Sequence, residues 1–190
     1  YYYNNDQFSI DCYTENEEPI QLYKGGAIGQ LLAVDTGETT FLYFSEVNGN
    51  LFSIQRLDVN TKEKMPISGG YATLLFTVHN NLIYYVNDKH ELWTVGFDGS
   101  KDKCLLKDDD VYSVCFVNDS MFLQTGDSVL EATENGKIKE TLPDISPVYD
   151  LLDGYICPIY GYKGMLYYTD SESTHMYQYD LNERSGGVPF

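Results

Sequence analysis

Positively charged residues are scarce in this chain: its 190 residues include 12 Lys and Arg against 29 Asp and Glu, a net charge of −17. A surface of that sign repels phosphate backbones, so we expect no nucleic-acid partner. Long apolar runs are also missing, since none approaches the roughly 18–20 residues that cross a bilayer. With 43% hydrophobic residues, the chain is still too apolar for a disordered acidic tail. We expect an acidic globular domain without a transmembrane segment.

Cysteine is sparse and irregularly spaced. Cys12, Cys104, Cys115 and Cys157 form no C-x-x-C pair and no zinc-ligand spacing. Each lies in a β-like run, where a thiol behaves as a small buried hydrophobe. One disulfide stays open as an alternative, with Cys104 and Cys115 on neighbouring strands as the candidate pair.

Tyrosine is abundant, with 18 residues, and tandem aromatic residues mark a repeat. Five aromatic slots begin at positions 2, 43, 84, 122 and 167, so their spacings are 41, 41, 38 and 45 residues. Tyr84-Tyr85-Val86-Asn87-Asp88 is a clear copy, and Phe122-Leu123-Gln124-Thr125-Gly126 is a degenerate one. A period near 40 residues is typical of the four-stranded blade of a β-propeller.

The third repeat shows how four strands fill one period. We predict strands at residues 71–79, 82–86, 91–97 and 104–106, joined by turns rich in Asn, Asp and Gly. Helical periodicity is missing from the chain. The prediction is an all-β fold, a β-propeller of four-stranded antiparallel blades in a single domain. The blades span approximately 1–25, 26–68, 69–107, 108–146 and 147–190.

The length suggests an incomplete ring. Five full blades would need roughly 205 residues at this period, and the first of the five blades lacks its inner strand. We therefore expect a fragment of a longer chain, whose remaining blades are partners of those seen here.

The aromatic slot also carries a family resemblance. Tyr167-Tyr168-Thr169-Asp170 is one substitution from the YWTD motif of propellers in low-density lipoprotein receptor-related proteins, and Phe97-Asp98-Gly99-Ser100 resembles the turn that follows it there. With Tyr in place of Trp, the chain more closely resembles a bacterial YWTD-like propeller family of unknown function. Gln124 and Gly126 depart from the motif. The resemblance implies a propeller, usually six-bladed, that binds a ligand, is secreted or attached to the bacterial cell surface, and has no assigned catalytic residue.

Residues that carry chemistry are few. His79, His90 and His175 all fall in expected turns, where we predict solvent-exposed side chains. Asp108-Asp109-Asp110 lies between two blades but lacks the spacing of a calcium-binding loop. Carboxylates near Pro143 and Pro147 are placed where a glycosidase pair would have to lie. We predict no catalytic residue, metal ligand or cofactor.

Charge placement is more informative. Lys and Arg gather near third-to-fourth strand turns, whereas Asp and Glu gather at second-to-third turns and at blade connections, which share the opposite rim of a propeller. We therefore hypothesise one electronegative rim that attracts a cationic partner. The candidate ligand-binding residues placed on this rim are Asp6, Tyr71, Asp88, His90, Asp109 and Glu172.

These patterns favour a non-catalytic extracellular binding module that presents rim loops to a protein or glycan ligand. Two alternatives stay open: a glycan-active enzyme, either glycosidase or lyase, at the propeller mouth, and a purely structural segment of a larger surface protein. The tyrosines themselves are expected to fill the wedge between splayed sheets, with a sugar-stacking platform as the alternative.

Overall fold

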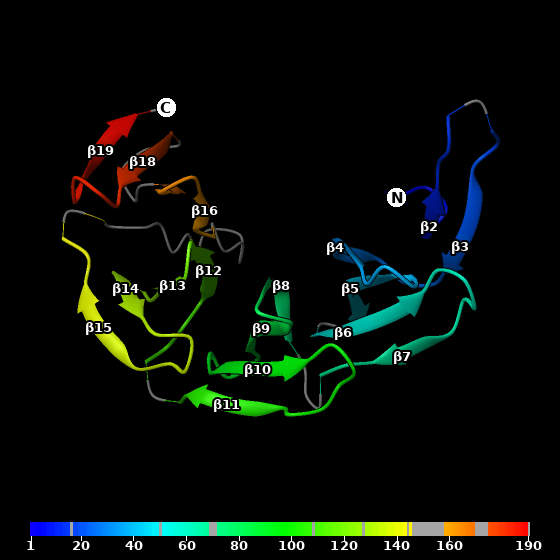
Figure 1. Cartoon of the computed structure of the whole chain (residues 1–190), viewed down its shortest axis with the longest axis horizontal. Coiled ribbons are helices and arrows are strands. Elements are labelled where there is room, and N and C mark those ends of the chain that lie inside the picture. Colours follow the sequence, from blue (N-terminus) through cyan, green and yellow to red (C-terminus); the bar gives the residue numbers. More distant parts are fainter. Residues whose placement is uncertain are drawn as a thin grey trace. The chain divides into compact units, whose positions relative to one another are not determined.

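The computed structural model describes residues 1–15, 17–49, 51–68, 72–107, 109–126, 128–143, 145, 158–169 and 175–189. Every regular element in these ranges is a β-strand. The described residues include no helix long and apolar enough to cross a membrane. The strands (Figure 1) are β1 (Tyr2–Asn4), β2 (Ser9–Cys12), β3 (Ile20–Lys24), β4 (Ile28–Asp35), β5 (Thr40–Asn48), β6 (Leu51–Asp58), β7 (Lys64–Pro66), β8 (Ala72–His79), β9 (Leu82–Asn87), β10 (Leu92–Gly96), β11 (Lys103–Leu106), β12 (Ser113–Val117), β13 (Ser120–Gln124), β14 (Val129–Ala132), β15 (Ile138–Thr141), β16 (Tyr160–Tyr162), β17 (Met165–Thr169), β18 (Met176–Asp180) and β19 (Ser185–Pro189).

Consecutive strands pair antiparallel in five sets. We call them the first sheet (β1–β3), second sheet (β4–β7), third sheet (β8–β11), fourth sheet (β12–β15) and fifth sheet (β16–β19). The second and third sheets are joined at one position, where Phe52 of β6 lies opposite Ala72 of β8. The predicted all-β fold of four-stranded antiparallel blades is confirmed, and the first sheet has three strands, as expected.

The third sheet follows its predicted strands closely because the turn residues suit their turns. Asn80 and Asn81 both adopt positive φ, 48° and 61°, in the β8–β9 hairpin, and Asn tolerates that region better than most residues. Gly99, with φ 81°, completes the β10–β11 turn, where the Asp98 carboxylate accepts the Ser100 amide at 3.0 Å. Local turn chemistry therefore sets the hairpin register here.

The chain divides into two compact units, one of residues 1–75 with 95–102 and one of residues 76–94 with 103–190. In the first unit, Ile10 and Leu22 pack against Leu42, Phe44 and Leu57 of the second sheet. The second unit has two such clusters, one between the third and fourth sheets and one between the fourth and fifth. The single-domain boundaries and the blade limits drawn from the sequence stay predictions.

Tyrosines of the second and third aromatic slots are buried, as expected for side chains that fill the space between sheets. Tyr43, Tyr84 and Tyr85 are at most 1% exposed. The Tyr43 hydroxyl also donates to the carbonyl of Phe97 at 3.1 Å, so the buried phenol keeps a hydrogen-bond partner.

The structure shows which tyrosine of the first repeat faces the second sheet. Tyr3 pairs with Ile10, and Ile10 is buried against the second sheet, whereas Tyr2 is 40% exposed. The pairing therefore places Tyr3 on the same side as Ile10, toward the second sheet. Because strand side chains alternate between faces, an error of one residue exchanges the buried and exposed sets.

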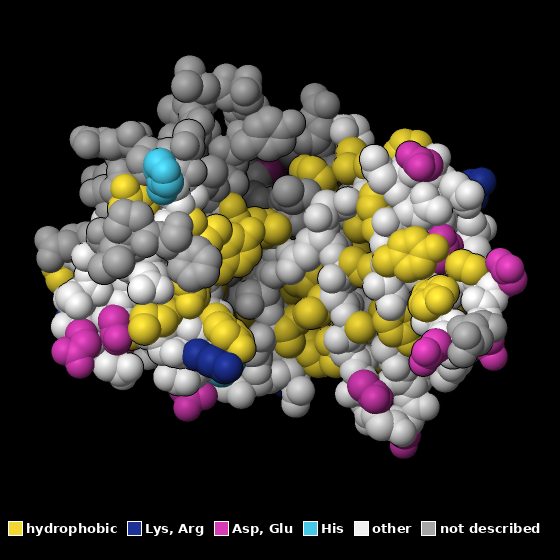
Figure 2. Space-filling view, turned by 90° about the horizontal axis from the view of Figure 1, so that it is seen from above, with side chains coloured by type: hydrophobic (Ala, Val, Ile, Leu, Met, Phe, Trp, Pro, Cys, Tyr) yellow, Lys and Arg dark blue, Asp and Glu magenta, His cyan; other side chains and the backbone are white. Residues whose placement is uncertain are grey.

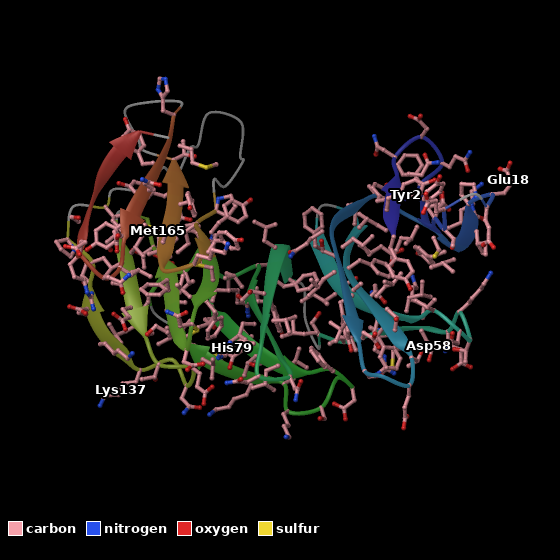
Figure 3. All side chains as sticks on the ribbon, turned by 45° about the horizontal axis from the view of Figure 1, so that its top comes forward. Tyr2, Glu18, Asp58, His79, Lys137 and Met165 are labelled. Atoms are coloured by element: carbon pink, nitrogen blue, oxygen red, sulfur yellow. The ribbon has the colours of Figure 1, made fainter. Side chains whose placement is uncertain are left out.

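The disulfide alternative and two of the three histidine predictions are wrong. The disulfide alternative fails, since Cys104 and Cys115 are both free thiols; burial raises the pKa of Cys115 to about 12. His79, labelled in Figure 3, is not an exposed turn residue. Its side chain is 14% exposed, and its ring stacks on Phe116 with centroids 4.1 Å apart. His90, predicted to be exposed, is half-buried. His175 is exposed, as predicted.

Candidate functional site

The β9–β10 turn is held rigidly by Asn87, which is 9% exposed. The Asn87 Oδ1 accepts the amides of Lys89 and Glu91, both at 2.9 Å, and its Nδ2 donates to Glu91 Oε2 at 2.8 Å. An Asx residue commonly stabilises a turn in this way. The bonds leave Asp88 and Lys89 exposed at the tip.

His90 ends this turn and connects it to the segment between the third and fourth sheets. Its φ of 60° directs the His90 carbonyl to the amide of Val111, 2.9 Å away. The His90 ring lies 4.5 Å from the Tyr112 ring, centroid to centroid, at 50°. Tyr112 is fixed in turn by its amide, which donates to the Gln124 carbonyl at 2.8 Å. The two segments therefore form one continuous surface.

We call this the His90 surface and define it as Asp88, Lys89, His90, Asp109, Asp110 and Tyr112. Its three carboxylates are exposed, while both rings are half-buried. The His90 Nδ1 is buried and makes no hydrogen bond within the described part of the chain. A partly covered aromatic pair beside solvated carboxylates suits a flat or cationic group.

Glu91 stabilises the β9–β10 turn and is not one of the residues of the His90 surface. Hydrogen bonds from the Trp93 indole, at 3.1 Å, and from Asn87 lower the pKa of Glu91 below its usual range. Its negative charge is therefore retained at neutral pH, where it fixes the turn. The described residues contain no group of three or more His, Cys, Asp or Glu side chains placed to hold a metal ion.

Charges at the third-to-fourth strand turns are partly neutralised. Lys64 Nζ lies 2.8 Å from Glu46 Oε2, Lys139 Nζ lies 2.9 Å from Glu131 Oε1, and Arg184 contacts both Glu131 and Glu140. Among the ion pairs of the described residues, none involves Asp88, Asp109 or Asp110. On the face that Figure 2 shows, Lys and Arg side chains are few beside those of Asp and Glu.

Three of the six residues predicted for ligand binding, Asp88, His90 and Asp109, lie on the two segments that the Val111–His90 hydrogen bond joins. Asp6 is exposed in the β1–β2 turn of the other unit and is not part of this surface. Tyr71 and Glu172 lie outside the described residues. Tyr112 was missed, although an aromatic residue directly after the acidic run could have indicated it.

Known proteins resemble this chain in fold. No family model matches it, and no curated protein matches its sequence. Among solved structures, a chain of a nidogen/laminin complex is 13% identical, with a TM-score of 0.53 over 97% of this chain and 90% of that chain. BamB from Moraxella catarrhalis is 14% identical, with a TM-score of 0.50 over 76% and 40%. The N-terminal domain of Nup159 is 16% identical, with a TM-score of 0.50 over 78% and 44%.

These comparisons establish the fold alone. The nidogen/laminin and BamB structures are β-propellers, which agrees with the blades described above. This chain spans less than half of the BamB and Nup159 chains that it matches. The conclusion they support is that this chain consists of β-propeller blades.

Proposed function

We propose that this chain is a non-catalytic binding module whose His90 surface receives a basic segment of a protein ligand. The observation that carries the proposal is the joining of exposed carboxylates and a half-buried aromatic pair on turns fixed by internal hydrogen bonds. Because the Asn87 bonds order the β9–β10 turn before binding, little conformational entropy is lost when a ligand docks. Lys and Arg side chains can contact both the carboxylates and the ring faces.

We further propose that the chain is extracellular or attached to the cell surface, and that it belongs to the bacterial YWTD-like propeller family. The Tyr167-Tyr168-Thr169 slot on β17 supports the family assignment. The match to the nidogen/laminin complex covers 90% of the matched chain. That structure is a complex of two named proteins, which is compatible with a protein-binding role for such blades.

The test uses an oligo-arginine peptide as the probe and the full chain as the receptor. Replacing Asp88 and Asp109 together, as Asp88→Asn and Asp109→Asn, is expected to weaken binding by about tenfold, the loss of roughly 1.4 kcal/mol. Titration calorimetry or biolayer interferometry measures the affinity. Binding should also weaken as salt rises, since exposed charges are screened.

A control double variant tests whether the peptide binds at the His90 surface or responds only to the overall negative charge of the chain. Glu38 is exposed in the β4–β5 turn of the other unit, so Glu38→Gln with Glu183→Gln removes the same charge elsewhere. This control should leave the affinity within about twofold of wild type. An equal loss in both double variants, or tight binding to a neutral glycan array that ignores Asp88 and Asp109, would contradict the proposal.

A further inference from the structure

The His90 surface is built from two connections at strand ends, and it lies on no sheet face. Asp88 and His90 belong to the turn between β9 and β10, whereas Asp109, Asp110 and Tyr112 belong to the segment between β11 and β12. All five residues are part of one compact unit. The way these two segments meet is therefore a property of that unit alone.

Two residues with positive φ bring the segments together. His90 has φ 60° and Asp110 has φ 45°, and His and Asp enter this region more readily than most residues. The Val111 amide, directly after Asp110, donates to the His90 carbonyl at 2.9 Å. On the other side, the Tyr112 amide donates to the Gln124 carbonyl at 2.8 Å. The backbone therefore positions both His90 and Tyr112 without help from a ligand.

The side chains of these two residues form what we call the His90–Tyr112 ring pair. The ring centroids are 4.5 Å apart and the planes are inclined at 50°. Gly126 leaves room for the phenol, since an added Cβ there would meet Tyr112 Cε2 at an ordinary 3.8 Å. Both side chains are half-buried, so each ring is partly removed from water. A partly dehydrated aromatic surface favours a weakly hydrated cation over a strongly hydrated one.

Carboxylates accompany the ring pair on both segments. Asp88 precedes His90 by two residues, and Asp110 precedes Tyr112 by two. Both carboxylates are exposed, and neither takes part in an ion pair within the described part of the chain. The surface therefore offers a cation two kinds of contact, a charged oxygen and an aromatic ring.

We propose that the His90–Tyr112 ring pair makes this surface select arginine over lysine in its basic ligand. The inference rests on the proposed function, because it names the side chain that the His90 surface recognises. A guanidinium is planar and weakly hydrated, so it stacks on a ring while its N–H groups bond a carboxylate in the same plane. An ammonium is compact and strongly hydrated, so it gives up more hydration beside half-buried rings.

The carboxylates and the rings have separable effects on binding. Attraction between the carboxylates and a cation depends on charge, which arginine and lysine share. The rings act on the shape and hydration of the cation, in which the two side chains differ. Removing carboxylates should therefore weaken both kinds of ligand by similar factors, whereas removing a ring should weaken the arginine ligand more.

The test compares an oligo-arginine and an oligo-lysine peptide of equal length and charge, titrated calorimetrically into the full chain at one salt concentration. Wild type is expected to bind the oligo-arginine peptide about fivefold more tightly or better. Tyr112→Leu should bring the two affinities within about twofold of each other. Tyr112→Phe keeps the ring and should keep the wild-type preference.

Two controls locate the effect. Tyr13 is 60% exposed and belongs to the other unit, so Tyr13→Leu removes an aromatic ring elsewhere and should leave the preference unchanged. Asp88→Asn with Asp109→Asn should weaken both peptides by similar factors. Circular dichroism confirms that each variant retains its strands. If Tyr112→Leu fails to fold, His90→Asn removes the other ring with a residue that tolerates positive φ.

The outcomes distinguish this inference from the proposed function. Equal affinities of wild type for the two peptides would overturn the selectivity and leave the His90 surface as a binding site. A preference that Tyr112→Leu and His90→Asn both leave unchanged would overturn it too, as would one that Tyr13→Leu abolishes. Binding of neither peptide would contradict the proposed function itself, and the selectivity with it.

Discussion

At the scale of single residues, Glu131 shows how a nearly buried carboxylate connects two sheets. Its side chain is 10% exposed. Oε1 accepts Ser120 Oγ and Lys139 Nζ, each at 2.9 Å, and Oε2 accepts Arg184 Nη2 at 3.1 Å. Burial raises the pKa of Glu131, but these hydrogen bonds and the nearby cations outweigh it, so the pKa lies below its usual 4.5. The carboxylate is therefore charged and paired at neutral pH.

Replacing this carboxylate should destabilise the second unit. Glu131→Gln keeps the shape but removes the charge that pairs with Lys139 and Arg184. Because these partners are 43% and 44% exposed, solvent screening limits the loss to about 1–2 kcal/mol. Urea unfolding measures it. The control is Glu140→Gln, whose carboxylate is 48% exposed and should change stability by less than about 0.5 kcal/mol. Equal effects would contradict a special role for Glu131.

The lowered pKa of Glu131 also sets a pH dependence. A carboxyl whose pKa is lower in the folded state binds fewer protons there than in the unfolded chain, so it stabilises the fold above its usual pKa. The stability difference between wild type and Glu131→Gln should be fully present above about pH 5. It should disappear as pH falls through the lowered folded-state pKa. A difference that grows on acidification would have the wrong sign.

At the scale of elements, strand packing depends on a glycine in the fifth sheet. Gly161 brings β16 against β12, where an added Cβ would lie 2.5 Å from Val117 Cγ2 and 2.6 Å from the Phe116 carbonyl oxygen. Backbone atoms cannot move aside as the end of a flexible side chain can. The contact therefore requires a residue without a Cβ.

Gly161→Ala should separate these two strands and cost about 1–3 kcal/mol through overpacking. The thermal unfolding temperature and urea midpoint measure the change. Gly126→Ala is the control, since its added Cβ would meet Tyr112 at an ordinary 3.8 Å and should be nearly neutral. An unchanged midpoint for Gly161→Ala would show that β16 does not approach β12 this closely.

Individual elements differ in how far the sequence predicts them. The third sheet was predicted strand by strand, because Asn80-Asn81 and Asp98-Gly99 fix its turns locally. In the first repeat, three consecutive tyrosines satisfy the motif in either register, so the sequence does not decide which of them faces inward. Only packing of Ile10 against the second sheet decides which tyrosines face inward. At the candidate site, Asp88 and His90 follow from turn position, whereas Tyr112 required a contact between segments.

At the scale of the whole molecule, the net charge of −17 opposes folding through self-repulsion. Raising the ionic strength from low values to about 0.5 M should therefore raise the thermal unfolding temperature, since the Debye length falls to a few Å. A lower unfolding temperature at high salt would mean that attractive ion pairs outweigh the repulsion.

The sequence by itself determined the all-β fold, the repeat period and most turns, because alternation of side chains and turn chemistry act over a few residues. The tertiary structure alone decided which face of each strand is buried, which thiols and imidazoles are enclosed, and which acidic turns meet. His90 and Tyr112 are 22 positions apart in the sequence, yet their rings lie 4.5 Å apart. Such meetings depend on how neighbouring sheets pack, and packing is a property of contacts between repeats rather than of any one repeat.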